Sequence, residues 1–145
     1  QIVMTLDNYD LQETFENAGV NYTISKNDVS SKMLASYIFE PDVARFNEDL
    51  LASASCKEDF DIQQYQVVPE CPYANTPFAQ VFEDLKRRLN VVPIGLSKLI
   101  NGNRTLYKLP ADDLPVEPGD YIVLITSGLR VSELESLLRV KEGVF

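Results

Sequence analysis

The sequence predicts an α/β fold, and three observations support this prediction. Strand and helix patterns alternate over roughly the first 25 residues, helical spacing then continues on both sides of Pro41, and short strand patterns separated by turns dominate after residue 60. The predicted architecture is therefore a partial Rossmann-like βαβ unit, a helical crossover (helix-turn-helix), and a small α+β C-terminal lobe. We place the boundaries at residues 1–27, 28–56 and 57–145.

The first 24 residues predict two parallel strands joined by a helix. Residues 2–6 (IVMTL) and 20–24 (VNYTI) are apolar strand patterns, and residues 9–17 between them place Leu11 and Phe15 on one helical face. Gly19 ends that helix. A strand–helix–strand order implies parallel strands with a helical crossover. Because the chain begins on a buried-strand pattern, we expect it to be part of a longer polypeptide.

Two consecutive helices are predicted between residues 27 and 54. Asn27 or Asp28 can cap the first helix, and Pro41 both ends it and opens the second, since proline suits a helix's first turn. Apolar residues recur at helical spacing in both: Met33, Leu34, Tyr37 and Ile38, then Val43, Phe46, Leu50 and Leu51. These side chains form either an intramolecular core or a dimer interface, because they are more apolar surface than one small lobe easily covers.

The rest of the chain predicts a compact α+β lobe. A strand at 62–68 precedes an irregular connector from Pro69 to Pro77, which contains three prolines and is a candidate lobe boundary. A helix to Leu89 follows, with Phe78, Val81, Phe82 and Leu85 on its buried side. Strands are expected at 91–99, 104–108 and 120–126, with a hairpin turn at 101–103 and a final helix at 132–140.

Composition excludes several classes of function. A net charge of −9 with no histidine argues against nucleic-acid binding, because phosphate backbones are bound by clustered Lys and Arg. The basic cluster Lys86–Arg88 lies late in a predicted helix, where it complements the helix dipole or binds an anion. Cys56 and Cys71 match no zinc or redox spacing. Because motifs for nucleophilic catalysis and phosphate loops are also absent, we expect no enzyme.

Two groups of acidic residues are candidates for binding a hard cation such as Ca²⁺. They are Glu40, Asp42, Glu48 and Asp49, and then Glu58, Asp59 and Asp61. Calcium takes six to eight oxygen ligands, but neither group has the acidic loop of a dedicated calcium site. Solvated surface charge is the alternative interpretation of both groups.

Taken in order, the N-terminal motifs resemble the second half of an RCK (regulator of potassium conductance) N-lobe. They are the strand at 2–5, the turn at 18–21 before the strand at 22–25, and the paired helices across Pro41. Residues 92–96 (VPIGL), 109–110 (LP) and 118–124 (PGDYIVL) are similar to the TrkA-C-type C-lobe of the same family. The resemblance covers nearly the whole chain, and its specificity lies in the order and spacing of the motifs.

RCK domains are cytoplasmic modules of ligand-gated potassium channels and potassium-uptake systems. The resemblance implies a non-enzymatic gating module at the cytoplasmic face of the cell membrane, where ligand binding is coupled to pore opening. It also implies a homodimer that pairs through the crossover helices, here Met33, Leu34, Tyr37, Ile38, Val43, Phe46 and Leu50, and that assembles further into a ring linked to a membrane pore.

The resemblance also implies candidate ligand sites. In calcium-gated members a carboxylate lies where the first crossover helix ends, and Glu40, with Asp42 nearby, falls there. The expected partner acids fall near Gln64 and Gln66, which are neutral. Asp7, at the end of a parallel strand, is a candidate for the edge of a cleft that binds an adenine nucleotide, although it is also a helix-capping residue.

Two other assignments remain open. The same fold serves as a regulatory subunit or C-lobe module of potassium transporters, which differ from channels in what precedes this segment. An unrelated class is half of a nucleotide-dependent oxidoreductase, which requires the glycine-rich turn that holds a pyrophosphate. That GxGxxG turn does not occur between Gln1 and Phe145.

Overall fold

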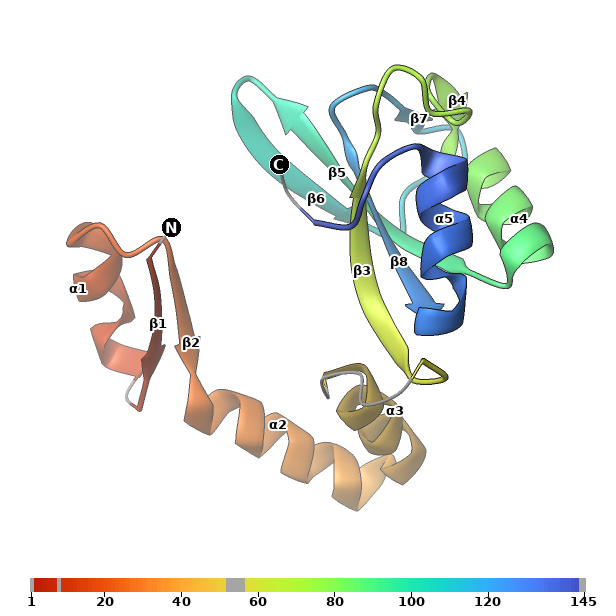
Figure 1. Cartoon of the computed structure of the whole chain (residues 1–145). Coiled ribbons are helices and arrows are strands. Elements are labelled where there is room, and N and C mark those ends of the chain that lie inside the picture. Colours follow the sequence, from red (N-terminus) through yellow and green to blue (C-terminus); the bar gives the residue numbers. More distant parts are fainter. Residues whose placement is uncertain (1, 8, 52–56, 144–145) are drawn as a thin grey trace. The chain divides into compact units, whose positions relative to one another are not determined.

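The computed structural model describes residues 2–7, 9–51 and 57–143 and divides the chain into two compact units. One unit is Gln1–Glu48 and the other is Asp49–Phe145, so the division falls within a helix. Figure 1 shows both units, which are described separately below. No helix in the described ranges is both long and apolar enough to span a membrane.

The first unit begins with the predicted βαβ arrangement. Strand β1 (Val3–Leu6) leads through the short 3₁₀ helix η1 (Tyr9–Leu11) and helix α1 (Gln12–Asn17) to strand β2 (Tyr22–Ser25). The two strands are parallel and lie side by side, with Val3 opposite Tyr22 (Figure 1). Gly19 has a φ of +97°, which lets the chain turn sharply after α1. The predicted parallel pair is therefore confirmed.

Helix α2 (Lys26–Phe39) follows β2 directly, and helix α3 (Pro41–Leu51) follows α2. Ser25 is the N-cap of α2 and its hydroxyl accepts a hydrogen bond from the Asp28 amide, so the prediction that Asn27 or Asp28 caps this helix was wrong. The helix starts two or three residues earlier because β2 ends on a residue that can itself cap. Pro41 opens α3 as predicted, and the expected end near Ala54 lies outside the described residues.

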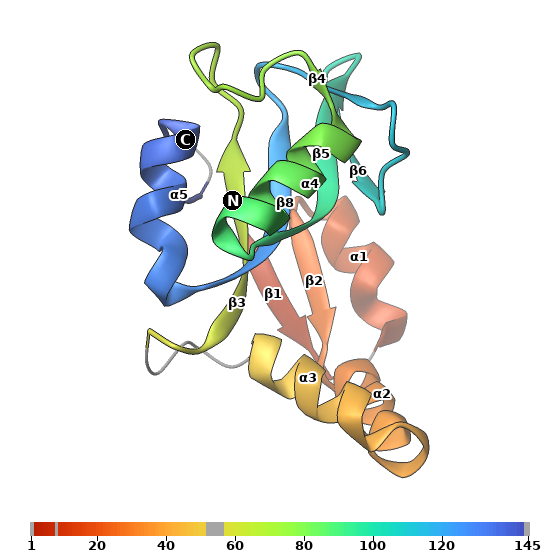
Figure 2. The same cartoon turned by 90° about the vertical axis from the view of Figure 1, so that its right-hand side faces the viewer.

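The second unit is built on an antiparallel sheet of four strands in the order β3-β8-β5-β6. Two helices pack with this sheet through a shared apolar core, and Figure 2 shows the arrangement from another side. The strands and helices are β3 (Phe60–Gln66), α4 (Phe78–Leu89), β5 (Val92–Ile100), β6 (Asn103–Lys108), β8 (Tyr121–Ser127), η2 (Gly128–Arg130) and α5 (Val131–Leu138). All of these correspond to predicted elements except η2.

One apolar core holds the second unit together. It contains the buried residues Val81 and Leu85 from α4, Leu134 and Leu138 from α5, and strand residues such as Tyr65, Leu96, Ile122 and Leu124. Phe82, predicted to be buried, is 41% exposed. It lines a surface pocket together with Phe78, Pro93 and Leu109.

The connector from Pro69 to Pro77 is not a lobe boundary. Cys71 and Tyr73 are buried in the core of the second unit, and both ends of the connector belong to that unit. The short strand β4 (Thr76–Pro77), which the sequence did not predict, pairs with β7 (Pro115–Val116). The prolines thus mark an irregular path across the core rather than a hinge.

The predicted hairpin turn of this unit is confirmed. Asn101 and Gly102 have φ values of 50° and 82° and join β5 to β6, as an Asn-Gly hairpin requires. Gly119 has a φ of +93° in the turn before β8. A residue with a side chain is strained at such angles, which explains why glycine occupies both positions.

The surroundings of Glu142 raise the pKa of its carboxyl above the ordinary value. The backbone of Glu142 pairs with that of Tyr65 in an isolated antiparallel bridge. The pKa of its carboxyl is raised mainly by burial, and further by the negative charges of Asp61 and Glu135. A carboxyl whose pKa is raised by folding contributes stability below its unfolded pKa and loses that contribution as pH rises through the folded pKa. At pH 7 this carboxylate is therefore a net cost to folding.

We expect Glu142→Gln to raise the melting temperature slightly at pH 7 and to leave it unchanged near pH 3, where the wild-type carboxyl is also neutral. Thermal melts followed by circular dichroism at both pH values measure this. Glu70→Gln, at an exposed position of the same unit, controls for the change in net charge. Equal shifts in the two variants would contradict the local explanation.

Candidate functional site

Helices α2 and α3 carry several apolar side chains that are exposed to solvent, here called the α2–α3 surface. Leu34, Ile38 and Phe46 are 64%, 65% and 53% exposed. Tyr37 and Val43 are also exposed, while Met33 and Leu50 are partly covered. Of the two helices' described residues, only Ala44 is fully buried. These side chains do not form a core within the unit.

Two further observations define this surface. Phe39, which the sequence analysis left out, is 81% exposed at the end of α2. The hydroxyl of Tyr37 donates a hydrogen bond to Glu48, which ties α2 to α3. Phe39 directly follows Ile38 in the sequence, but the helical spacing of the other apolar residues does not place it on the same helix face. The predicted dimer interface itself stays a prediction.

The acidic candidates Glu40 and Asp42 lie at the junction of α2 and α3. Glu40 is the C-cap of α2, and Asp42 is 3.9 Å from the guanidinium of Arg45. Both are exposed, and the residues that the structure describes contain no group of three or more acidic, histidine or cysteine side chains arranged to hold a metal ion. The two residues offer two carboxylates, whereas Ca²⁺ takes six to eight oxygen ligands, and the proposed site stays a prediction.

Asp7 lies just past the carboxyl end of β1, as predicted. Its carboxylate is 3.4 Å from the ammonium of Lys26, and its carbonyl oxygen accepts a hydrogen bond of 2.8 Å from the side chain of Asn27. The side chain is 87% exposed. It is therefore held near the start of α2 and remains open to a ligand at this edge of the parallel pair, where α/β proteins commonly bind ligands.

The basic cluster Lys86–Arg88 forms the last turn of α4, where it complements the helix dipole as predicted. Arg88 pairs with Asp84 at 3.0 Å, and Arg87 lies 3.8 Å from Glu83. Asp84 also accepts a hydrogen bond of 2.6 Å from the Tyr73 hydroxyl. That bond first, and then the bond from Arg88, lower the pKa of Asp84, so it remains charged beside the arginine.

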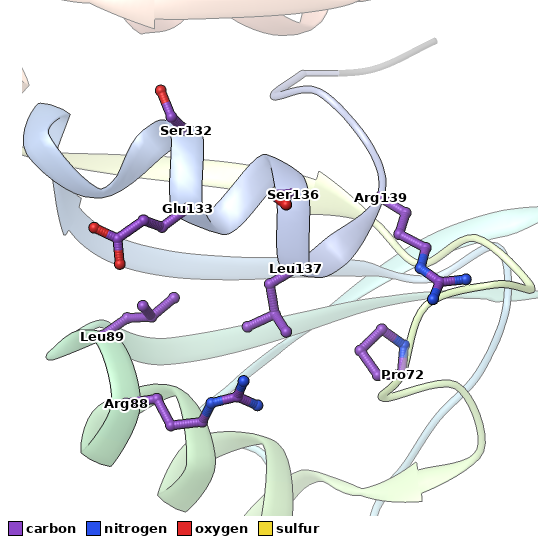
Figure 3. A pocket seen from close by; sticks show the side chains of 8 residues that line it. All are labelled: Pro72, Arg88, Leu89, Ser132, Glu133, Ser136, Leu137 and Arg139. Carbon is purple, nitrogen blue, oxygen red and sulfur yellow. The ribbon is translucent and has the colours of Figure 1, made fainter.

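A solvent-open pocket of about 720 Å³ lies between α4 and α5 in the second unit (Figure 3). Arg88 reaches into it from α4 and Arg139 from the end of α5, with Leu137 and Pro72 between them. The remaining lining residues are Leu89, Ser132, Glu133 and Ser136. No pattern along the chain predicts this pocket, because its walls come from a connector and two helices that are far apart in the chain.

Comparison with known proteins identifies the fold. Neither a family model nor a curated protein matches the sequence. Among solved structures, the human SLO3 gating ring matches 87% of this chain with a TM-score of 0.68 and 17% identity. The GsuK RCK domain matches 96% with a TM-score of 0.51 and 12% identity, and the GsuK channel bound to NAD matches 96% with a TM-score of 0.51 and 13% identity.

These matches extend over nearly the whole chain, as the sequence resemblance did. The chain spans only 26%, 27% and 22% of the three matched chains, in the same order. At such low identity the similarity bears on the fold. The βαβ start, the paired helices across Pro41 and the α+β unit occur in the order that the motifs predicted. The chain therefore has the fold of RCK domains.

Proposed function

We propose that this chain is a ligand-sensing regulatory module that gates a potassium channel and acts without catalysing a reaction. The fold supports the proposal, since it is shared with the GsuK RCK domain and the SLO3 gating ring. In this proposal the chain works at the cytoplasmic face of the membrane, attached to a pore. The alternative is that the chain belongs to a regulatory subunit of a potassium transporter, in which ligand binding would control transport in place of channel opening.

The observation that carries the proposal is the exposed α2–α3 surface. An apolar stripe of this kind is normally buried. Its centre, Leu34, Ile38 and Phe46, is more than half exposed within its unit. Contiguous exposed apolar side chains mark interaction sites. We infer that two copies of the chain cover this surface, giving a homodimer that can assemble into a larger ring.

Ligand sensing requires that a ligand bind one arrangement of the assembly more tightly than another. The energy available for gating is limited to that difference in affinity, typically about 1–3 kcal/mol for a coupled pair of sites. A nucleotide is the regulatory ligand that we favour, because the GsuK channel of similar fold is bound to NAD. Asp7 is the residue that we assign to the edge of its site.

Calcium at Glu40 and Asp42 is a weaker candidate, because the described residues supply too few ligands. Binding to nucleic acid is not expected at a net charge of −9.

Light scattering at several protein concentrations, with NAD, ATP or Ca²⁺ and without them, tests the proposal. We expect a dimer that persists on dilution and a change in mass or dissociation constant with a nucleotide. Asp7→Asn should weaken that nucleotide effect without changing the mass of the free protein. A monomer at every concentration, indifferent to all three ligands, would overturn both the assembly and the sensing function.

A further inference from the structure

Strand β6 lies at an edge of the four-stranded sheet, with one side open. Its only strand partner among the described residues is β5, because the sheet order ends at β6 (Figure 1). All six residues of β6 are exposed. The opposite edge, β3, is partly covered by the chain itself, since the Gly143 amide donates a hydrogen bond to the Gln64 carbonyl at 3.0 Å. The chain thus covers part of one edge of this sheet and leaves the other free to pair.

The hairpin geometry determines which main-chain groups of β6 face outward. The two-residue loop makes Ile100 and Asn103 a hydrogen-bonded pair. Along an antiparallel ladder such pairs alternate with pairs that share no hydrogen bond. Arg104, Leu106 and Lys108 are therefore the residues whose N–H and C=O groups point away from β5. These groups are the ones that a further strand would meet.

The side chains of these three residues lie on the sheet face opposite the apolar core. Leu96 of β5 belongs to the core and is paired with Tyr107, so Leu106, one position away, faces the other side. Arg104 and Lys108 are two positions from Leu106 and share its face. Leu106 is 50% exposed. The open edge therefore carries an exposed apolar side chain between two cations.

Both charged residues of β6 are basic, in a chain whose net charge is −9. Lys108 forms no ion pair with the described residues. The Arg104 guanidinium lies 4.4 Å from the centre of the Tyr121 ring and donates to the Ser97 carbonyl through one nitrogen, which leaves other N–H groups free. Two copies of β6 aligned on Leu106 would place Arg104 of one opposite Lys108 of the other. Because like charges in opposite positions destabilise a strand pair, β6 is poorly suited to pair with itself.

The same charges favour a strand of opposite sign. We propose that β6 binds an extended acidic segment of a partner protein, which adds a fifth strand antiparallel to β6. Its main chain pairs with Arg104, Leu106 and Lys108, with carboxylates opposite the two cations and an apolar side chain opposite Leu106. In such strand addition the main-chain hydrogen bonds give affinity and alternate side chains give specificity. The inference goes beyond the proposed function and does not depend on it, since strand addition can be measured whether or not the chain gates a channel.

The probe is the acetylated and amidated peptide Thr-Glu-Thr-Val-Thr-Glu-Thr, titrated into the full chain and followed by two-dimensional ¹H–¹⁵N NMR. We expect it to shift the amide signals of Arg104, Leu106 and Lys108. The same peptide with Lys in place of both Glu should bind at least about tenfold more weakly. N-methylation of its Val should also weaken binding about tenfold, because the methyl group removes a main-chain donor at the centre of the pairing.

Lys108→Glu should weaken binding of the acidic peptide about tenfold, because a favourable cross-strand pair becomes a repulsive one. The peptide Thr-Lys-Thr-Val-Thr-Glu-Thr should restore binding to this variant, since an antiparallel strand places its lysine opposite position 108. Lys141→Glu, the same charge change at an exposed residue beside the covered edge, is the matched control and should bind as the wild type does. Circular dichroism confirms that both variants remain folded.

Four results would overturn the inference: no binding of the acidic peptide at millimolar concentration, equal binding of the basic peptide, no effect of N-methylation, or equal weakening by Lys141→Glu and Lys108→Glu. The first three comparisons use the wild-type chain and therefore remain decisive if a variant fails to fold. Tight binding of the acidic peptide that N-methylation leaves unchanged would mean that charge alone attracts it, without strand addition.

Discussion

Replacing Asp120 with alanine should lower the free energy of unfolding by about 3–5 kcal/mol, the cost of breaking a buried ion pair. Asp120 is 4% exposed, and its Oδ2 accepts hydrogen bonds from Lys98 Nζ at 2.7 Å and from the Glu117 amide at 2.9 Å. Lys98 Nζ also donates to Glu117 and to the carbonyl of Pro115. Without Asp120, a largely buried ammonium loses its closest counter-charge.

The pH dependence of this ion pair follows from Lys98. Burial on its own lowers the pKa of the Lys98 ammonium, but the hydrogen bonds that it donates to Asp120 and Glu117 outweigh burial and raise the pKa above its ordinary value. A cation whose pKa is raised by folding contributes stability below its unfolded pKa and loses that contribution as pH rises through the folded pKa. The contribution of the Lys98 charge should therefore be complete at neutral pH and decline in strongly alkaline solution.

Urea denaturation followed by circular dichroism measures the loss, since the chain has no tryptophan for fluorescence. Asp113→Ala, an exposed aspartate in the loop before β7, is the matched control and should change stability by no more than about 0.5 kcal/mol. The double variant Lys98→Met/Asp120→Ala should be less destabilised than the sum of the single variants, because neither charge remains unpaired. Equal effects of Asp120→Ala and Asp113→Ala would show that the ion pair does not stabilise the turn.

The sequence predicted the elements whose signals are local. The parallel pair β1–β2 followed from alternating patterns, the start of α3 from Pro41, and the β5–β6 hairpin from Asn101-Gly102. Each of these depends on a residue type whose backbone preference acts within a few positions. Competing local signals explain the error at α2, where Ser25 caps in place of Asn27 or Asp28.

Features that depend on packing could not be predicted in this way. Cys71 and Tyr73 lie in a proline-rich connector that resembles a linker, yet both are buried in the core. Lys98 and Asp120 are close only because β5 pairs with β8, and Arg88 and Arg139 line one pocket only because α4 and α5 share the core. No pattern along the sequence predicts such contacts between residues that are far apart in the chain.

For the α2–α3 surface, the sequence predicted an apolar stripe but left open what covers it. The structure narrows this choice, because the stripe is exposed within its own unit. If two copies cover this surface, the loss of its apolar side chains should weaken dimer formation by an amount that can be estimated. Apolar burial contributes roughly 25 cal/mol for each Å² removed from water, and an interface is most sensitive to the large side chains at its centre.

The double variant Ile38→Glu/Phe46→Glu should convert the dimer to a monomer. Each substitution places a carboxylate where an exposed apolar side chain would be covered by the second copy, and truncating a central interface residue commonly costs about 2 kcal/mol or more. A homodimer loses four such side chains, two from each copy, and even two losses weaken association by about a thousandfold, since 1.4 kcal/mol corresponds to a factor of ten. Light scattering at micromolar protein measures the change in mass.

The monomer should remain folded, because Ile38 and Phe46 are 65% and 53% exposed and contribute little to the core of their own unit. Leu129→Glu is the matched control, since Leu129 is 55% exposed in the second unit and lies outside the α2–α3 surface. A dimer that survives both glutamates would mean that the chain associates through another surface. If Leu129→Glu also converts the dimer to a monomer, added negative charge would be enough to separate the copies, wherever on the surface it is placed.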